Sequence, residues 1–401
     1  MIISEELAKK LSSYVDEGRV TALASKLIGT PSWQRSGQEE VAKYCAAYME
    51  GMGMDVQLQE IVDSNGTSVK QAIGCFPGAE GGPSLLLCSH LDTLPPYKPH
   101  LWKKKLGDVE DGFIYGVGGQ KCGMAAMMEA ARAVNKAIKL KGDLIVACLA
   151  DEMRGGLGIQ HLLNGGLKPD AAIVGEDTDL QLVTISVAGI FGKINIDGRP
   201  DRPKGLGGID PLDKMVKLLQ ELKAFQPMPP DGWLTFLPHK ELPGYPRFNI
   251  VSILLHPFEY PTSCSLIFDC RIVPGQSEET VRRDLEALLK DIKAHDPNLV
   301  TELTIPAPGW FNRLPFEISP DEPIVKTIAK WHEYVVGTKP YIGSGIRLGF
   351  ASDANNLLAA GVKCVNYGPG DFREPIDERK KVGDMVKAAK VYALAAAEIC
   401  G

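Results

Sequence analysis

Residues 83–96 read PSLLLCSHLDTLPP, and this stretch decides the fold class. The run PSLLLC is continuously apolar, as in a strand of a parallel sheet that is buried on both faces. His90 and Asp92 follow it two residues apart, so in extended backbone their side chains point the same way. Ligand sites of α/β folds lie beyond the carboxyl ends of such strands, and a metal-binding histidine usually has a carboxylate partner. The stretch therefore predicts an α/β sheet with a site at this strand end.

Length, charge and cysteine usage exclude several classes of protein. A chain of 401 residues exceeds the size at which one core stops growing, so two domains are expected. The net charge of −6 argues against a sequence-independent nucleic-acid binder. No apolar run approaches the ~20 residues of a membrane span, and the acidic N-terminus does not resemble a signal peptide. Nine scattered cysteines without a CxxC pair suit reduced thiols, so we expect a cytoplasmic protein with no nucleic-acid or membrane partner.

Apolar strands and amphipathic helices alternate along the first half of the chain. Strands are expected near 54–62, 68–75, 83–89, 142–150 and 170–176, and helices at 4–29, 37–52, 121–137 and 156–166. This alternation predicts an α/β fold in which a mostly parallel sheet carries helices on both faces.

The pattern changes at about Phe191, where half-exposed strands and amphipathic helices begin. Strands are expected at 191–199, 247–256 and 263–272, and helices at 210–225 and 277–294. This order predicts that 195–305 is an inserted, smaller α+β domain of a lid or dimerisation type. Residues 1–194 and 306–401 are expected to form one catalytic-type α/β domain, to which helices at 321–337 and 382–400 return.

Four stretches rich in carboxylates or histidine follow apolar strands of the predicted sheet. They read SHLD (89–92), ADE (150–152), VGEDT (174–178) and YGPGDFREPIDE (367–378). Any one of them alone is as well explained by a solvated loop. Four in one sheet indicate a functional cleft, where charged groups converge.

The chain resembles the dizinc exopeptidase and amidohydrolase family of aminoacylases, acetylornithine deacetylases, succinyl-diaminopimelate desuccinylases and glutamate carboxypeptidases. The resemblance covers nearly the whole chain. It is carried by the motifs SHLDTLPP (89–96), GFIYGVGG (112–119), KCGMAAMMEA (121–130), LADEMRGGLG (149–158), IVGEDT (173–178), DGRP (197–200), FDCRIVPG (268–275) and YGPG (367–370). It implies the two-domain fold, a homodimer, and hydrolysis of the amide or acyl bond of a small amino-acid- or peptide-like carboxylate substrate.

The resemblance assigns roles to four residues. His90 matches a ligand of one zinc, and Asp92 matches the carboxylate that orients this histidine. Glu152 matches the general base that takes a proton from the attacking water. Glu176 matches a carboxylate ligand of the same zinc as His90. His90, Asp92 and Glu152 are therefore the expected catalytic residues.

Several metal ligands of the family are missing from this chain. In GVGGQKCG the aspartate that bridges both zincs is absent, and the segment is about two residues short. Met153 stands where the family has a second glutamate, and a thioether is a poor zinc ligand. No histidine follows GPG near the end, and DGRP is not followed by the family's oxyanion-binding histidine. These departures abolish one metal site.

The other metal site keeps only His90 and Glu176, while zinc ordinarily has three or four protein ligands. The site is therefore expected to be weak or vacant unless Asp177, Cys122 or another group joins it. For Cys122, packing as a small residue at a helix start is the favoured alternative. The expected cofactor is none or a single weakly bound zinc.

Two arginines and one asparagine are candidates for binding the substrate. A guanidinium matches a carboxylate in a bidentate manner, which favours Arg347 and Arg373. Asn355 lies on a polar stretch that resembles part of the family's cleft. Arg271 is expected to be structural.

Three functions remain open. The first is a divergent enzyme that works with one metal or none and uses Glu152 as general acid and base. The second is a catalytically inactive pseudoenzyme that binds a ligand or a partner protein. The third is a conventional zinc-dependent amidohydrolase or carboxypeptidase with ligands from elsewhere, which three missing ligand positions disfavour. The first is preferred because Glu152 and the cleft glycines remain, but fold analogy alone does not establish function.

Overall fold

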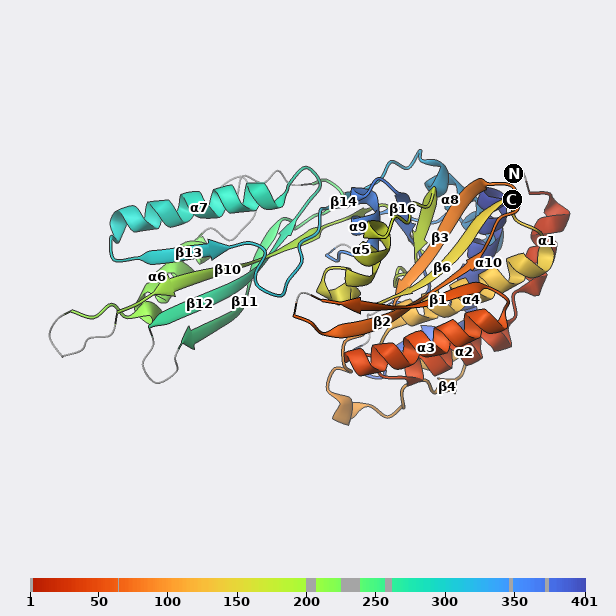
Figure 1. Ribbon diagram of the computed structural model, residues 1–401, viewed down its shortest axis with the longest axis horizontal. Coiled ribbons are helices and arrows are strands. Elements are labelled where there is room, and N and C mark those ends of the chain that lie inside the picture. The colour runs from red at the N-terminus through yellow and green to blue at the C-terminus, as the bar shows by residue number, and fades with distance from the viewer. Residues whose placement is uncertain are drawn as a thin grey trace. The chain divides into compact units, whose positions relative to one another are not determined.

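The computed structural model describes residues 3–63, 65–199, 207–224, 239–256, 262–345, 349–371 and 375–401. The chain divides into two compact units (Figure 1). Unit 1 comprises Met1–Ile185, Glu317–Arg347 and Ser352–Gly401. Unit 2 comprises Ser186–Phe316 and Leu348–Ala351, a wider range than the expected 195–305.

An eight-stranded sheet forms the centre of unit 1. In order of pairing its strands are β1 (Asp55–Val62), β2 (Ser68–Phe76), β6 (Gly142–Leu149), β3 (Gly82–His90), β7 (Ala171–Val174), β16 (Lys363–Asn366), β8 (Leu182–Val183) and β15 (Ile342–Gly343). Strands β6, β3, β7 and β16 run parallel, whereas β1 and β2 form an antiparallel edge. The prediction of a mostly parallel α/β sheet is confirmed.

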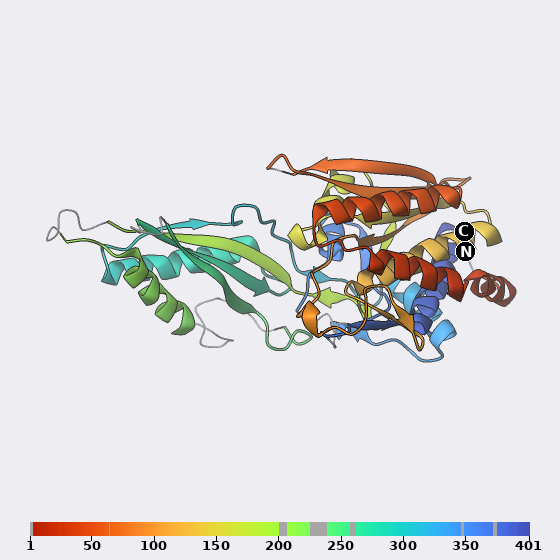
Figure 2. The same ribbon diagram turned by 90° about the horizontal axis from the view of Figure 1, so that it is seen from below.

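Eight helices are described in unit 1. They are α1 (Glu5–Tyr14), α2 (Glu17–Gly29), α3 (Arg35–Gly51), α4 (Gly119–Ala137), α5 (Leu157–Asn164), α8 (Pro323–Val336), α9 (Asp353–Ala359) and α10 (Val382–Cys400). Helices α4 and α10 pack against each other and against β3 (Figure 2). Leu85, Leu86 and Leu87 of β3 are all fully buried, and successive strand side chains point to opposite faces. Both faces of the sheet are therefore covered.

The single helix expected at 4–29 is two helices in the structure. Val15 has extended backbone, and the side chain of Asp16 accepts a hydrogen bond from the N–H of Arg19. Aspartate is among the preferred N-cap residues, because its carboxylate satisfies an N–H that has no partner within the helix. The backbone N–H of Asp16 also donates to Glu129 of α4 at 2.8 Å, which fixes the break. The prediction of one continuous helix is wrong for this reason.

Seven short elements connect the larger ones. They are the 3₁₀ turns η1 (Pro99–Leu101) and η2 (Glu152–Arg154) and the strands β4 (Val109–Glu110), β5 (Phe113–Tyr115), β9 (Ile185–Ser186), β14 (Phe316–Glu317) and β17 (Arg379–Lys381). Strand β17 pairs with β5, with Lys380 opposite Ile114. Such short segments carry too few side chains to show a periodicity in the sequence.

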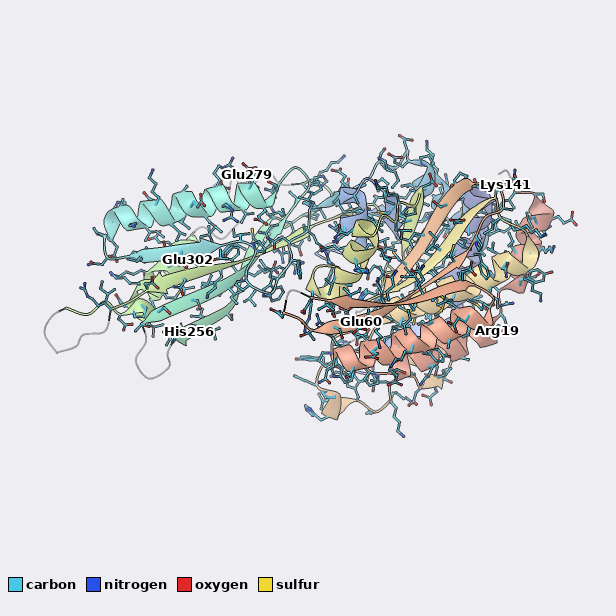
Figure 3. All side chains as sticks on the ribbon, in the orientation of Figure 1. Arg19, Glu60, Lys141, His256, Glu279 and Glu302 are labelled. Carbon is cyan, nitrogen blue, oxygen red and sulfur yellow. The ribbon has the colours of Figure 1, made fainter. Side chains whose placement is uncertain are left out.

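Unit 2 has a four-stranded antiparallel sheet and two helices. The strands, in order of pairing, are β11 (Arg247–His256), β12 (Ser263–Ile272), β10 (Ala188–Asp197) and β13 (Val300–Thr304), and the helices are α6 (Pro211–Ala224) and α7 (Glu278–His295). Its core contains Ile194, Leu218, Phe268 and Leu285, so the helices cover one face of the sheet. Glu279 of α7 is exposed and points outward in Figure 3.

Among the residues that the structure describes, every helix is too short or too polar to cross a membrane.

Candidate active site

Three neighbouring strands of unit 1 end at the same edge of the sheet. Strand β3 lies between β6 and β7 and ends at His90. Glu152 follows β6, and Glu176 follows β7. Because the strands are parallel, their carboxyl ends meet, and all three side chains are at least nine-tenths buried. The structure thus brings together residues that lie up to 86 positions apart in the sequence. Next to His90 and Glu176, the hydroxyl of Ser89 donates a hydrogen bond to the carbonyl of Gly175 and so links the two strand ends.

Asp92 joins the loop after β3 to the loop after β6. One carboxylate oxygen contacts His90 Nδ1 at 3.1 Å and accepts the backbone N–H of Glu152 at 3.0 Å. The other accepts the backbone N–H of Met153 at 2.9 Å. Burial raises the pKa of Asp92, but the hydrogen bond to His90 and these two N–H groups lower it overall. A charged Asp92 therefore fixes both the ring of His90 and the start of η2.

His90 faces two carboxylates with its other ring nitrogen. Nε2 lies 3.7 Å from Glu176 and 4.0 Å from Glu152. Burial lowers the pKa of His90, but the hydrogen bond to Asp92 and the negative charge of Glu176 raise it to about 10. Without a metal, the ring is therefore an imidazolium at neutral pH, held by Asp92 and aimed at Glu152 and Glu176.

The turn that carries Glu152 is anchored by Arg35 and Gln38, which no sequence motif indicates. Asp151 has a φ of 52°, which places a non-glycine residue in the left-handed region. Arg35 donates two hydrogen bonds to Asp151 at 2.9 and 2.5 Å and also pairs with Asp63 at 2.8 Å. Gln38 and Asp151 exchange two further hydrogen bonds. Strained residues cluster at functional sites, where neighbouring groups hold them in place.

In the shortened segment GVGGQKCG (116–123), Gly119 lies against a carboxylate from another loop. A Cβ added to Gly119 would lie 2.5 Å from Cγ and 2.7 Å from Oδ2 of Asp177, and still closer to Oδ1. Gln120 next to it donates a hydrogen bond to the carbonyl of Asp92 at 2.7 Å. The side chain of Asp177 thus occupies the space that any side chain at position 119 would need.

Lys121 and Cys122 lie in the first turn of α4, directly after Gly119 and Gln120. Lys121 donates to the carbonyls of Leu27 and Thr30 at 2.9 and 2.8 Å, which ties α4 to the end of α2. Burial lowers the pKa of Lys121 to about 7. Cys122 is fully buried, and burial raises the pKa of its thiol. Full burial near the start of α4, outside any three-donor group among the described residues, favours the packing interpretation of Cys122.

A second lysine lies in the same region and was not recognised from the sequence. The side chain of Lys380 is fully buried, pairs with Glu378 at 2.6 Å, and donates a hydrogen bond to the carbonyl of Asp371. Burial lowers the pKa of Lys380, but the charges of Asp177 and Glu378 raise it overall, so it is an ammonium ion. No sequence signal identified it, because Lys380 stands in the charged run DERKK and its burial and partners appear only in the folded chain.

Of the three candidate substrate-binding residues, the structure describes only Asn355. Arg347 and Arg373 lie outside the described residues. Asn355 is buried in α9, where its side-chain oxygen accepts the N–H of Ser352 as part of a capping box. Its role in binding a substrate stays a prediction. Arg271 of unit 2 pairs with Asp269 at 2.8 Å, as expected of a structural residue.

The donor set does not by itself fit a two-metal centre. Across the part of the chain that the structure describes, no three His, Cys, Asp or Glu side chains are arranged so that they can hold a metal ion. His90 and Glu176 offer two donors, one fewer than the usual minimum for zinc. The exposed thioether of Met153 adds no suitable ligand.

Comparison with known protein families identifies the family to which this fold and these motifs belong. The model of peptidase family M20/M25/M40 matches residues 86–398, which is most of the chain. The chain belongs to this family. The resemblance found in the sequence motifs is confirmed, and the M20 match includes every strand end that carries a candidate site residue.

Relatives and solved structures of the M20 family match over most of the chain. The acetylornithine deacetylase of Aliivibrio fischeri is 27% identical over 343 residues, covering 80% of this chain and 83% of the relative. Human carnosine dipeptidase 1 superposes with a TM-score of 0.73 at 14% identity, covering 98% of this chain and 99% of that one. The YXEP protein of Bacillus subtilis, a dinuclear metal binding peptidase from the M20 family, gives 0.63 at 14% identity, covering 96% and 98%. The fold is that of an M20 hydrolase.

Proposed function

We propose that this chain is a divergent M20 hydrolase that cleaves the amide or acyl bond of a small, carboxylate-bearing, amino-acid- or peptide-like substrate. We further propose that it works with one metal ion or none. The observation that carries the proposal is the double role of Asp92. This buried carboxylate contacts His90 at 3.1 Å and the backbone N–H of Glu152 at 3.0 Å, so an acid and a base are held in one fixed arrangement.

In the proposed reaction, Glu152 removes a proton from the attacking water and returns it to the leaving nitrogen. Such general acid–base catalysis contributes roughly 10²–10⁴-fold to a rate. In the metal-free version, the His90 imidazolium, oriented by Asp92, donates a hydrogen bond to the oxygen of the scissile bond as negative charge develops on it; in the one-metal version, His90 and Glu176 would hold the metal and the metal would stabilise this charge. Both groups lie at the carboxyl edge of the sheet, and Glu152 Oε2 is 4.0 Å from His90 Nε2.

Relatives support the class of reaction. The acetylornithine deacetylase of Aliivibrio fischeri and the deformylase of Bacillus subtilis, which acts on a formylated aminomethylpyrimidine, both carry names that denote hydrolysis of an acylated amine. A substrate carboxylate would be bound by Arg347 or Arg373, as expected from the sequence. A cytoplasmic homodimer remains part of the proposal.

The alternative is a pseudoenzyme that binds such a ligand without turnover. The observation in its favour is the donor set, because the described residues do not form a three-ligand metal group. The alternative gives no reason for the strained backbone of Asp151, with its φ of 52°, next to Glu152. We therefore favour the enzyme.

The test is a turnover screen with N-acyl amino acids and dipeptides, repeated with and without chelator. On the best substrate, Glu152→Gln should lower the rate by about 10²–10⁴-fold while the circular dichroism spectrum stays unchanged. Met153→Leu, on the exposed next residue, is the matched control and should keep full activity. Activity that survives chelator but is lost in Glu152→Gln and His90→Ala supports the metal-free version. Full activity in Glu152→Gln would refute the role of this glutamate.

A further inference from the structure

A cavity of about 520 Å³ lies in unit 1, between the start of α2 and the C-terminal ends of α3 and α4. The larger side chains that line it are those of Arg19, Tyr48, Met52, Arg132, Asn135 and Lys136. Of the described residues in its walls, three are cations and none is acidic, although the chain as a whole has a net charge of −6. Ligand cavities usually measure about 300–1,000 Å³ and combine an apolar wall with a few polar groups. The size and the lining therefore suit a small anion.

One of the three cations is fixed, and the other two are available to a ligand. Arg132 donates to both carboxylate oxygens of Glu129, at 2.8 and 2.6 Å, and to the carbonyl of Tyr14. These bonds use Nε and Nη2, so Nη1 remains for a ligand. Arg19 is exposed at the surface (Figure 3), and the Lys136 ammonium lies over the Tyr14 ring. Within the described ranges, neither of these two side chains forms an ion pair.

The charges around the cavity leave an excess of two positive charges. Glu129 is fully buried and offsets one of the three cations, and its carboxylate also accepts the backbone N–H of Asp16 at 2.8 Å. The carboxylate of Asp16 is exposed, so water and salt screen its charge. A phosphate monoester carries a charge of about −1.5 to −2 at pH 7, which matches this excess. Arginine and lysine are also the residues that proteins use to bind phosphate.

The remaining wall suits a flat organic group next to the phosphate. The side chains of Tyr48 and Met52 are half-buried and form the apolar part of the lining. Burial raises the pKa of Tyr48, so its phenol is protonated at neutral pH and can donate a hydrogen bond. A Cβ added to Gly51 would meet no atom within 4 Å, so the space beside this wall is open. An aromatic ring can therefore stack in the cavity.

The cavity lies far from the candidate active site. Helix α4 has 19 residues and is therefore about 28 Å long. Gln120, in its first turn, donates to the carbonyl of Asp92, whereas Asn135 and Lys136, in its last turn, line the cavity. The two sites are thus at opposite ends of one helix.

We propose that this cavity binds a nucleoside monophosphate. Arg19, Lys136 and the free Nη1 of Arg132 contact the phosphate, and the base lies against Tyr48 and Met52. The binding is separate from hydrolysis, so the proposal does not depend on the proposed function of the catalytic residues.

The test is isothermal titration calorimetry of the full-length protein at low salt, with AMP, UMP, adenosine and inorganic phosphate as probes. At least one of the two nucleotides should bind at one site per chain. Adenosine should bind at least about tenfold more weakly than AMP, because one hydrogen bond between charged groups accounts for about that factor. Inorganic phosphate should also bind more weakly, because it lacks the base. Absence of binding by both nucleotides overturns the proposal, and so does equal affinity for AMP and either fragment.

Variants of the two available cations locate the bound nucleotide. Arg19→Gln and Lys136→Gln should each weaken AMP binding by about tenfold or more. Lys139→Gln removes an exposed lysine just beyond the end of α4 and is the matched control, which should bind AMP as wild type does. Wild-type affinity in both Arg19→Gln and Lys136→Gln would place the nucleotide elsewhere and overturn the proposal.

A second pair of variants tests the cavity without removing a cation. Gly51→Glu brings a carboxylate to the open side of the cavity and should weaken AMP binding, whereas Gly51→Ala should not, and both side chains have room. His90→Ala should bind AMP as wild type does, because His90 is at the other end of α4. Circular dichroism checks that each variant is folded. Loss of AMP binding in folded His90→Ala would place the nucleotide in the active site and refute the proposal.

Discussion

The carboxylate of Asp92 accepts the backbone N–H of Glu152 at 3.0 Å, although the two residues lie 60 positions apart. The same oxygen contacts Nδ1 of His90 at 3.1 Å. The general base proposed for this enzyme is thus positioned through its main chain by the group that orients the histidine. A change at Asp92 should therefore disturb both partners at once.

Asp92→Asn tests this coupling. Asparagine has one acceptor oxygen instead of two, so it cannot serve His90, Glu152 and Met153 together. In a Ser-His-Asp triad the corresponding change lowers turnover by about 10⁴-fold through the wrong histidine tautomer, and we expect a loss of at least about 10²-fold here. The measurement is kcat on the substrate found in the screen, with circular dichroism as the check on folding. A loss confined to KM would contradict the coupling.

Arg35 should determine the stability of the turn before Glu152. The Asp151 side chain is only 1% exposed, and removing one partner of a buried ion pair leaves an uncompensated charge. Arg35→Met should lower the free energy of unfolding by roughly 3 kcal/mol, measured by urea denaturation. Arg35→Lys keeps the charge but not the planar two-pronged donor, so it should recover only part of this loss. Equal stability of wild type and Arg35→Met would show that Gln38 alone holds the turn.

The metal content should fall well below that of a two-zinc peptidase. The purified protein is expected to hold fewer than two zinc ions per chain, most simply a substoichiometric amount or none, because its donor set is incomplete. Mass spectrometry of the metals after dialysis against a mild chelator measures this. Two tightly bound zinc ions per chain would contradict the prediction and favour a conventional metallopeptidase.

Asp63 should make the protein sensitive to acid. Hydrogen bonding from the Thr67 backbone lowers the pKa of Asp63, and Arg35 lowers it further. Since the folded pKa lies below the unfolded value, this group contributes stability above the unfolded pKa, near 3.8, that is lost as the pH falls through the folded pKa. Asp63→Asn should therefore show a shallower fall in unfolding free energy below about pH 4. Identical slopes for variant and wild type would exclude Asp63 as a source of acid sensitivity.

Gly119→Ala should destabilise the protein because of Asp177. The added Cβ would lie 2.5 Å from the Asp177 Cγ, and overpacking of this kind costs about 1–3 kcal/mol. Adding Asp177→Ala removes the clash and should reverse part of the decrease in melting temperature that Gly119→Ala causes. Gly383→Ala in α10, where an added Cβ meets no atom within 4 Å, is the matched control and should not destabilise. A single variant as stable as this control would contradict the predicted overlap.

The architecture of unit 1 and the family follow from local patterns along the chain. Long apolar runs such as 83–88 and long amphipathic helices repeat a signal over many residues, so their type does not depend on distant contacts. The same reasoning placed His90, Glu152 and Glu176 at strand ends, and parallel strands bring their carboxyl ends to one edge.

The polar side chains that hold these residues in place are specified by contacts between distant parts of the folded chain. Arg35 lies 116 positions from Asp151, and Lys121 lies 94 positions from Leu27, so no local pattern links the members of either pair. The break at Asp16 likewise depends on Glu129 of another helix. The Asp177 carboxylate fits because Gly119, on α4, has no side chain, and Lys380 reaches Glu378 and Asp371 from the short strand β17. A buried charge is stable only when a partner lies within reach, and that distance is a property of the folded chain.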